Sequence, residues 1–172
     1  MMEQWDIYDK NRNLTGRIME RGSKFGKDDF HLVIHVCIFN SKNQILIQQR
    51  QPWKKKWPNM WDITVGGCAM SGETSVEAAE RETLEEIGYK IDLSGERPFF
   101  TINFEVGFDD QYLVEREIDI KELTLQYEEV QRVKWASKDE ILQLVKEGKF
   151  INYWFTELLF DIRKQRSGYT IV

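Results

Sequence analysis

The segment from Gly66 to Tyr89, GGCAMSGETSVEAAERETLEEIGY, constrains the fold of this chain more than any other stretch. Thr74 and Glu77 form the T-x-x-E pattern of a capping box, which marks the start of a helix. Gly88 is the residue type at which helices commonly end, because glycine tolerates a left-handed backbone. The segment therefore predicts a loop followed by one helix of about four turns.

Three carboxylates lie on one face of this predicted helix. Glu82, Glu85 and Glu86 are three and four positions apart, so their side chains are neighbours. Ala78 lies beside them. The other side, expected to be buried, holds Val76, Ala79, Thr83, Leu84 and Ile87. One interpretation is a solvated helix face on which Arg81 pairs with Glu85. The alternative is a cation site, since Mg²⁺ and Mn²⁺ prefer oxygen ligands and would relieve the repulsion between the carboxylates.

The spacing of the whole segment favours the second interpretation, because it resembles the Nudix box, G-x5-E-x7-R-E-U-x-E-E-x-G-U, in which U is a bulky apolar residue. The matching positions are Gly67, Glu73, Arg81, Glu82, Glu85, Glu86, Gly88 and Tyr89. Thr83 stands where the family usually has an aliphatic residue, a departure that concerns packing rather than chemistry. The resemblance implies an α+β fold, the Nudix-type α/β/α sandwich with a mixed β-sheet between helices.

The resemblance also implies an activity: Mg²⁺-dependent hydrolysis of a diphosphate linkage, in a nucleoside diphosphate derivative or a similar X-linked diphosphate. Glu82, Glu85 and Glu86 would hold Mg²⁺, with Mn²⁺ as an alternative. Glu85, Glu86 and Arg81 would be catalytic, and Gly67 and Glu73 would shape the loop and its backbone. The general base stays open, since family members differ. The candidates are Glu85 and Glu86 within the box, and Glu105, Glu128 and Glu129 outside it.

A wider resemblance points to the Nudix branch that includes isopentenyl-diphosphate isomerase. It rests on the D-x-Y-D opening, the strand that begins at His31, the Trp57-Pro58 and Trp61-Asp62 pairs, and the segment 129–135. Isomerase activity is disfavoured, because Gly66 stands in the slot of the catalytic cysteine and Cys68 in that of a metal-binding histidine. An isomerase-like enzyme and a non-catalytic Nudix ligand-binding domain remain the alternatives, although such binding domains usually lose box carboxylates.

The composition of the chain limits the kinds of molecule that it is expected to bind. The chain has 172 residues, 41% hydrophobic, and a net charge of −5, which suits one domain over 1–172 and excludes a general basic surface for nucleic acid. No run of 18 apolar residues occurs, and the start, MMEQWDIYDKNRN, is polar. We therefore expect a cytoplasmic protein with no membrane association, with Cys37 and Cys68 as reduced thiols. The expected partner is a small-molecule diphosphate.

The remaining chain predicts further elements. Expected strands are a hairpin within 3–21, His31–Phe39 paired with 44–50, then 62–65, 98–106, 111–118 and 130–135, with a turn at 107–110. Ser137 and Glu140 open a helix to about residue 147, and a last helix spans 150–165, whose apolar face packs the core or forms a homodimer.

The loop 51–61 interleaves tryptophans and lysines, a composition that stacks a base and holds a phosphate. Alternatively its tryptophans pack on the core while the lysines stay solvated, which is the preferred interpretation for Trp61. We expect specificity to come from loops such as 51–61 and 107–112. The candidate substrate-binding residues are Arg50, Lys54, Lys56, Trp57 and Glu129.

Overall fold

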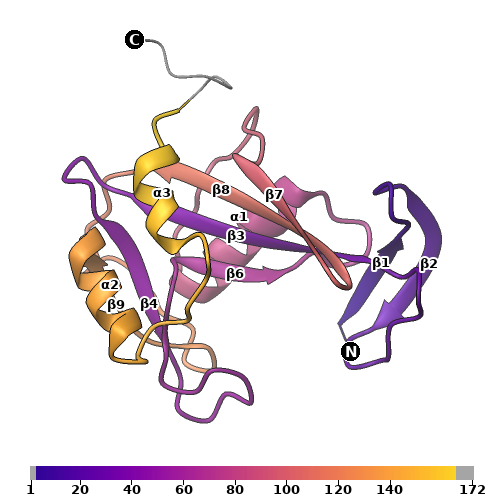
Figure 1. Ribbon diagram of the computed structural model, residues 1–172, viewed down its shortest axis with the longest axis horizontal. Helices are drawn as coiled ribbons and strands as arrows, with labels where there is room; N and C mark the ends of the chain where they lie inside the picture. Colours follow the sequence, from indigo (N-terminus) through magenta and orange to yellow (C-terminus); the bar gives the residue numbers. More distant parts are fainter. Residues whose placement is uncertain (1–2, 166–172) are drawn as a thin grey trace. The chain divides into compact units, whose positions relative to one another are not determined.

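A computed structural model describes residues 3–165 and has an α+β fold (Figure 1). The first strands are β1 (Gln4–Tyr8), β2 (Leu14–Glu20), β3 (His31–Phe39), β4 (Ile45–Arg50), β5 (Trp61–Asp62) and β6 (Val65–Cys68). After helix α1 (Ser75–Ile87) come β7 (Phe100–Phe104), β8 (Gly107–Glu115), β9 (Val130–Ala136), α2 (Lys138–Lys146) and α3 (Thr156–Ile162). None of the described helices is long and apolar enough to cross a membrane.

The chain divides into two compact units. The first holds Met1–Val36 and Val65–Tyr112, and the second holds Cys37–Thr64 and Leu113–Val172. Strands β3 and β8 pass through both units, with their first residues in the first unit. The expectation of a single domain over 1–172 stays a prediction, and each unit is described by itself.

The first unit contains the predicted N-terminal hairpin and the strands around the box. Strands β1 and β2 pair antiparallel, from Gln4 opposite Glu20. Strand β6 pairs antiparallel with β3, with His35 opposite Gly66 and Ile34 opposite Gly67. Helix α1 packs against β6, and its residues Ala78, Ala79 and Ile87 are fully buried.

The sheet is mixed, as predicted, because β3 and β8 run in the same direction. In the first unit His31 N–H donates to the Val106 carbonyl at 3.0 Å, and in the second Arg116 N–H donates to the Phe39 carbonyl at 2.9 Å. These two bonds advance together along both strands, which is the pattern of a parallel pair. The other strand pairs are antiparallel, including β7 with β8, from Phe100 opposite Gln111.

Two predicted strand boundaries are wrong. The segment 107–110 is the start of β8 rather than a turn, because Phe104 pairs with Gly107 and leaves only residues 105–106 to reverse the chain. The expected strand 62–65 is instead split into β5 and β6, and β6 continues through both glycines to Cys68, since Cys68 pairs with Val33. The loop 107–112 that we expected to set specificity is therefore strand.

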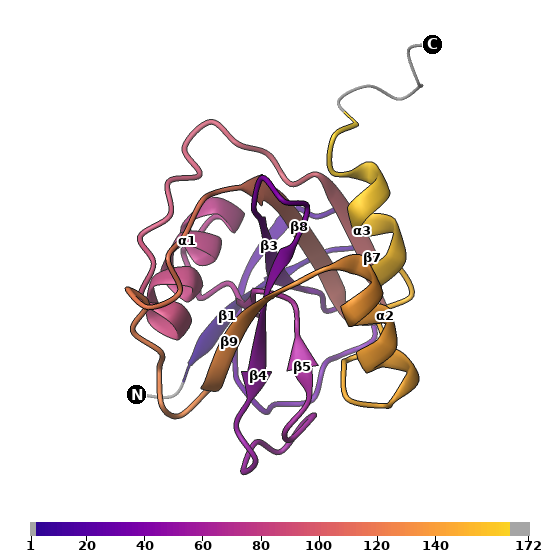
Figure 2. The same cartoon turned by 90° about the vertical axis from the view of Figure 1, so that its left-hand side faces the viewer.

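In the second unit, β4 is the central strand (Figure 2). It pairs with β9 from Ile45 opposite Ala136 to Arg50 opposite Val130, and with β5 at Gln48 opposite Asp62. Phe39 at the end of β3 pairs with Ile45, which confirms the predicted β3–β4 pairing. Residues Ile45, Leu46 and Ile47 are completely buried.

The two C-terminal helices differ in how well the sequence predicts them. The Ser137–Glu140 capping box is present and α2 ends where expected. The predicted helix 150–165 is wrong in its first part, since α3 begins only at Thr156. Trp61 N–H donates to the Lys149 carbonyl at 2.8 Å, and Ile151 N–H donates to the Trp61 carbonyl at 2.9 Å. These bonds hold residues 149–151 in an extended bridge against Trp61, which a helix cannot form.

Candidate active site

Helix α1 begins and ends as its sequence predicts. Thr74 Oγ1 accepts a hydrogen bond from Glu77 N–H at 3.3 Å, and Glu77 Oε2 accepts one from Thr74 N–H at 2.8 Å. Gly88 has a φ of 69°, and its N–H donates to the Leu84 carbonyl at 3.0 Å. Both ends of the helix are thus satisfied by their own residues, which gives the carboxylates on it a defined register.

The loop before α1 is held by the N-terminal hairpin. Ser71 Oγ donates to Asp6 Oδ1 at 2.7 Å, and Gly72 N–H donates to Asp6 Oδ2 at 2.8 Å. The Ser71 N–H also donates to the Gln4 carbonyl at 2.8 Å. Strand β1 therefore positions the loop that carries Glu73.

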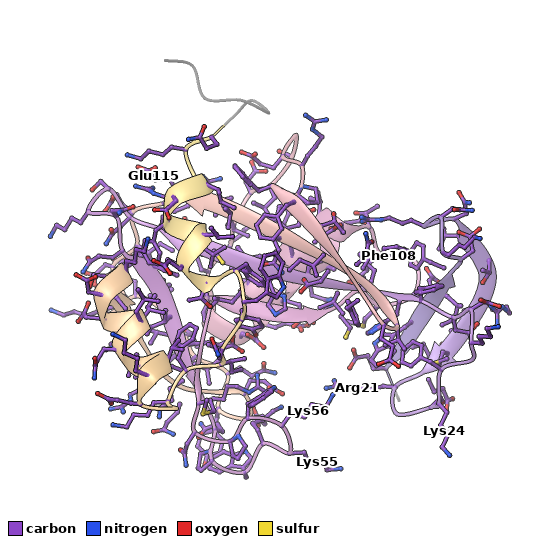
Figure 3. All side chains as sticks on the ribbon, in the orientation of Figure 1. Arg21, Lys24, Lys55, Lys56, Phe108 and Glu115 are labelled. Carbon is purple, nitrogen blue, oxygen red and sulfur yellow. The ribbon has the colours of Figure 1, made fainter. Side chains whose placement is uncertain are left out.

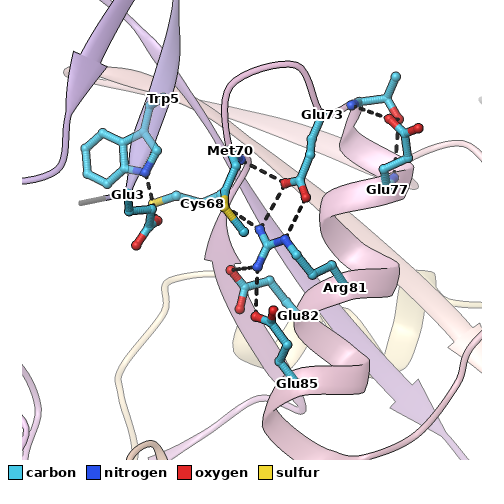
Figure 4. A network of polar contacts seen from close by, with 10 residues as sticks. Glu3, Trp5, Cys68, Met70, Glu73, Glu77, Arg81, Glu82 and Glu85 are labelled. Atoms are coloured by element: carbon cyan, nitrogen blue, oxygen red, sulfur yellow. Dashed lines mark hydrogen bonds and ion pairs between the residues drawn. The ribbon is translucent and has the colours of Figure 1, made fainter. Parts of the chain in front are cut away.

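Arg81 joins Glu73, Glu82 and Glu85 into one network (Figure 4). Its Nε donates to Glu73 Oε1 at 2.6 Å, and its Nη1 lies 3.0 Å from both Glu82 Oε1 and Glu85 Oε2. Its Nη2 donates to Glu73 Oε2 at 3.0 Å and to the Cys68 carbonyl at 3.1 Å. The expected i,i+4 pair with Glu85 is present. Glu73 also accepts from Met70 N–H at 2.8 Å, so it links the loop to the helix.

The three carboxylates differ in exposure. The Glu85 side chain is 48% exposed and that of Glu82 is 14% exposed, whereas Glu86 is buried. Ala78 is buried as well, whereas Leu84, expected to be buried, is 51% exposed. The buried face of α1 is thus rotated toward Glu82 and Glu86. On the side of β6 that faces the helix, Gly67 has no side chain, and the Glu82 side chain occupies that space.

Gly67 makes the close approach of Glu82 to strand β6 sterically allowed. A Cβ at position 67 would lie 2.7 Å from Glu82 Cγ and closer still to its carboxylate carbon. Burial raises the pKa of Glu82 to about 7, although the charge of Arg81 opposes this rise and those of Glu85 and Glu3 add to it. We conclude that burial outweighs the ion pair, because the Arg81 charge is shared among three carboxylates.

Arg81 stays charged in this network. Burial opposes its charge, but the hydrogen bond to Glu73 and the charges of Glu82 and Glu73 raise the pKa of Arg81 above its ordinary value. Thr83, the departure from the family pattern, is fully buried, and its Oγ1 donates to the Ala79 carbonyl at 2.7 Å. Its hydroxyl is therefore satisfied within the helix, as expected for a change that affects only packing.

The donor set suits a hard divalent cation. Carboxylate oxygens are the ligands that Mg²⁺ and Mn²⁺ prefer, and Glu82, Glu85 and Glu86 supply them from one helix. Within residues 3–165, no three His, Cys, Asp or Glu side chains are already gathered around one point as metal ligands. In this arrangement Arg81 Nη1 lies between Glu82 and Glu85 and supplies the positive charge there. The residues therefore fit a metal by their chemistry, with side chains that must turn to bind it.

Sequence reasoning missed a buried network around Asp110 in the first unit. Asp110 is fully buried, accepts from Arg12 Nη1 at 2.8 Å, and also contacts Thr101 Oγ1 and Ser75 Oγ, both at 2.6 Å. Tyr112 Oη donates to Ser75 Oγ at 2.9 Å. The network links four parts of the first unit, namely the β1–β2 turn, β7, β8 and the first residue of α1. No local signal pointed to this network, because Asp110 was expected in a turn at 107–110 and its partners are distant in sequence.

The candidate substrate residues lie in the second unit and pair mainly with one another. Lys54 forms an ion pair with Glu129, and Arg50 Nε donates to the Lys56 carbonyl at 3.3 Å. Trp57 is exposed with a φ of 52°, whereas Trp61 is buried, as the packing interpretation predicts. Figure 3 shows the Lys55 and Lys56 side chains extending from their loop. A role for these residues in substrate binding stays a prediction.

The candidate bases outside the box are divided between the units. Glu105 is exposed in the β7–β8 turn of the first unit. Glu128 is exposed in the second unit, where Glu129 is already paired with Lys54. Within the first unit, Glu85 is the box carboxylate most accessible to solvent.

Known proteins resemble this chain over most of its length. Residues 29–158 match the family model described as the NUDIX domain. A protein of Listeria monocytogenes described as an uncharacterized Nudix hydrolase is 49% identical over 162 residues, which cover 94% of this chain and 96% of the relative. An isopentenyl-diphosphate Delta-isomerase of Pectobacterium atrosepticum is 32% identical over 159 residues, which cover 87% of this chain and 85% of that enzyme.

Similarity to a solved structure supports the fold. A crystal structure of a Deinococcus radiodurans protein matches with a TM-score of 0.73 and 22% identity, covering 91% of this chain and 97% of that one. The chain belongs to the Nudix family. More specifically, it is an enzyme of the Nudix hydrolase class, in the branch that also resembles isopentenyl-diphosphate isomerases. The predicted family, branch and α+β fold are confirmed.

Proposed function

We propose that this chain is a Mg²⁺-dependent hydrolase that cleaves a diphosphate linkage in a nucleoside diphosphate derivative or a similar X-linked diphosphate, with Mn²⁺ as an alternative metal. The observation that carries the proposal is the complete set of box carboxylates, with Glu82 against Gly67 and Arg81 between Glu82 and Glu85. A cation held by Glu82, Glu85 and Glu86 would neutralise the diphosphate charge and lower the pKa of a bound water.

In the proposed reaction a water oxygen bonds to phosphorus while the bond from phosphorus to the bridging oxygen breaks. The water proton goes to a carboxylate, for which Glu85 is suited by its exposure, with Glu86 and Glu105 as further candidates. Arg81 holds Glu82 and Glu85 toward each other, so its role is to position them. Glu73 in turn fixes Arg81 through two hydrogen bonds.

The surroundings of Gly66 favour hydrolysis over the isomerase alternative. A Cβ at this position would lie 2.6 Å from His35 Nε2, which is shorter than carbon–nitrogen contacts allow. The His35 ring thus occupies the space that a cysteine side chain at position 66 would need. The non-catalytic alternative is disfavoured because every box carboxylate is kept. The cytoplasmic location, the small-molecule partner and a homodimer remain part of the proposal.

The test is a panel of nucleoside diphosphate derivatives incubated with Mg²⁺, with Mn²⁺ or with EDTA. We expect metal-dependent release of phosphate or nucleoside monophosphate from at least one compound. Glu85→Gln or Glu86→Gln is expected to lower the rate at least about 10²-fold, the scale of losing a main electrostatic catalyst. Glu122→Gln, a change at an exposed glutamate of the second unit, is the matched control. Unchanged activity in both box variants, or no turnover of any diphosphate, would contradict the proposal.

A further inference from the structure

Three cationic side chains of the second unit line one open hollow. Strands β5, β4 and β9 lie side by side there (Figure 2), with Trp61 opposite Gln49 and Gln49 opposite Arg132. Residues that are opposite each other on paired strands, or two apart on one strand, share a face of the sheet, so Lys134 lies on the same face as these three. The hollow has a volume of about 730 Å³, and its lining includes Gln49, Asn59, Trp61, Arg132, Lys134 and Lys149. We call it the β9 basic hollow.

The Trp61 ring gathers two of these cations. The Arg132 guanidinium carbon and Lys134 Nζ each lie 5.2 Å from the centre of the Trp61 ring, which is buried. One such contact contributes about 0.5–1 kcal/mol at an exposed site, but two like charges on the same ring also repel each other. A carboxylate between them would relieve this repulsion, and among residues 3–165 neither cation forms an ion pair with one. The pair of charges is therefore left for an anion from solution.

The Arg132 guanidinium is held in one orientation by the sheet beneath it. Its Nε donates to Gln49 Oε1 at 2.6 Å, and Gln49 Nε2 donates to the Asn59 carbonyl at 2.8 Å. Gln49 is buried, so both ends of its amide are used to fix Arg132. The Arg132 Nη1 and Nη2 atoms donate to no residue within 3–165. They form a pre-oriented fork of donors, which matches two oxygens of one anion.

The charge and the size of the hollow favour a phosphate group. Its described lining has three cations and no carboxylate, although Lys149 Nζ also pairs with Glu147 Oε2 at 2.8 Å. The chain as a whole has a net charge of −5, so this positive surface is local and does not suit a long polyanion. A phosphate group carries nearly two negative charges above pH 7 and offers three acceptor oxygens. The volume lies within the range of small-molecule sites, about 300–1,000 Å³, so a small organic group can accompany the phosphate.

We infer that the β9 basic hollow binds a phosphate group, either as the free ion or as the phosphate monoester of a small molecule. Arg132 contacts two phosphate oxygens through Nη1 and Nη2, Lys134 and Lys149 supply further positive charge, and Gln49 is a positioning residue. None of these residues belongs to the Nudix box or to the candidate substrate residues of the 50–57 segment. The inference therefore goes beyond the proposed function and does not depend on it, and binding requires no divalent metal.

The test is an NMR titration at pH 8 in EDTA and at constant ionic strength. It follows the indole N–H signal of Trp61, which is identified by its absence in Trp61→Phe. Inorganic phosphate and glycerol 3-phosphate are the two probes, and each is expected to shift the signal saturably. Tighter binding of glycerol 3-phosphate would assign the site to a phosphate monoester, and equal binding would assign it to the free ion.

Four substitutions in the second unit test the named roles. Arg132→Gln and Lys134→Gln are each expected to weaken phosphate binding at least about 10-fold, because each removes a charge-assisted contact. Gln49→Met keeps every charge and is expected to weaken binding about 3-fold through the loss of one hydrogen bond to Arg132, an effect that charge attraction alone would not produce. Lys121→Gln, at an exposed lysine, removes the same charge as Lys134→Gln and is the matched control, with binding unchanged.

The combined variant Glu82→Gln, Glu85→Gln and Glu86→Gln separates this site from the proposed hydrolase site, and it is expected to bind phosphate as the unmodified chain does. Loss of phosphate binding in that variant, undiminished binding by Arg132→Gln and Lys134→Gln, or no saturable shift with either probe would overturn the inference. Phosphate binding that depends on Arg132 supports it even if no diphosphate is hydrolysed, a result that would defeat only the hydrolase proposal. Thermal melting checks that each variant is folded. If Arg132→Gln is unfolded, Arg132→Lys, which loses the fork, replaces it with the same expected loss.

Discussion

Glu82 makes the stability of the metal-free protein depend on pH in a direction opposite to that of most ion-paired carboxylates. Burial raises the pKa of Glu82 from 4.5 to about 7, and its side chain is only 14% exposed. A group whose folded-state pKa is raised stabilises the fold below its unfolded pKa and loses that contribution as the pH rises through the folded pKa. Between pH 4.5 and 7 the loss is about 3 kcal/mol, since each pKa unit is worth about 1.4 kcal/mol.

The assay is urea denaturation in EDTA at several pH values, with Glu82→Gln as the reference that removes the titration. The difference in free energy of unfolding, unmodified chain minus Glu82→Gln, is expected to fall by about 3 kcal/mol from pH 4.5 to 7 and then to level off. A difference that rises with pH would show that the Arg81 ion pair outweighs burial and would refute the reasoning. A flat difference would show that Glu82 titrates alike in the folded and unfolded chains.

Other substitutions test the packing and the buried networks, each by urea denaturation. Asp110→Ala is expected to cost about 3 kcal/mol, because Arg12 loses its buried partner; a cost near zero would contradict the network. Thr83→Val, which restores an aliphatic residue, is expected to change stability by less than about 1 kcal/mol, since only an intrahelical hydrogen bond is lost. Gly66→Ala is expected to destabilise the fold through its clash with His35, and adding His35→Ala is expected to recover most of the loss; no recovery would place the strain elsewhere.

Local signals in the sequence were enough to predict helix α1 and its contacts within one turn. The Thr74–Glu77 capping box, the left-handed Gly88 and the Arg81–Glu85 pair all involve residues three or four positions apart, or a single backbone requirement. The bounds of β3 were equally predictable, because its β-branched residues form one continuous run.

The other features of the fold and the site depend on contacts between residues that are distant in the sequence. Glu86 is buried, Leu84 is exposed, and Gly67 of β6 allows the close approach of Glu82, and helical periodicity alone does not predict any of these three features. Residues 149–151 are extended because Trp61 pairs with them, although their composition suits a helix. The His35–Asp109 pair joins residues 74 positions apart, so no local sequence pattern predicts it.

The most direct test of the proposed metal site is Mn²⁺ binding measured by the loss of the free-ion signal in electron paramagnetic resonance. The unmodified chain at pH 8, above the pKa of Glu82, is expected to bind Mn²⁺. The combined variant Glu82→Gln, Glu85→Gln and Glu86→Gln is expected to lose at least about 10²-fold in affinity, because its ligands no longer carry charge, while Glu122→Gln binds as before. Binding of equal strength by the combined variant would contradict the account.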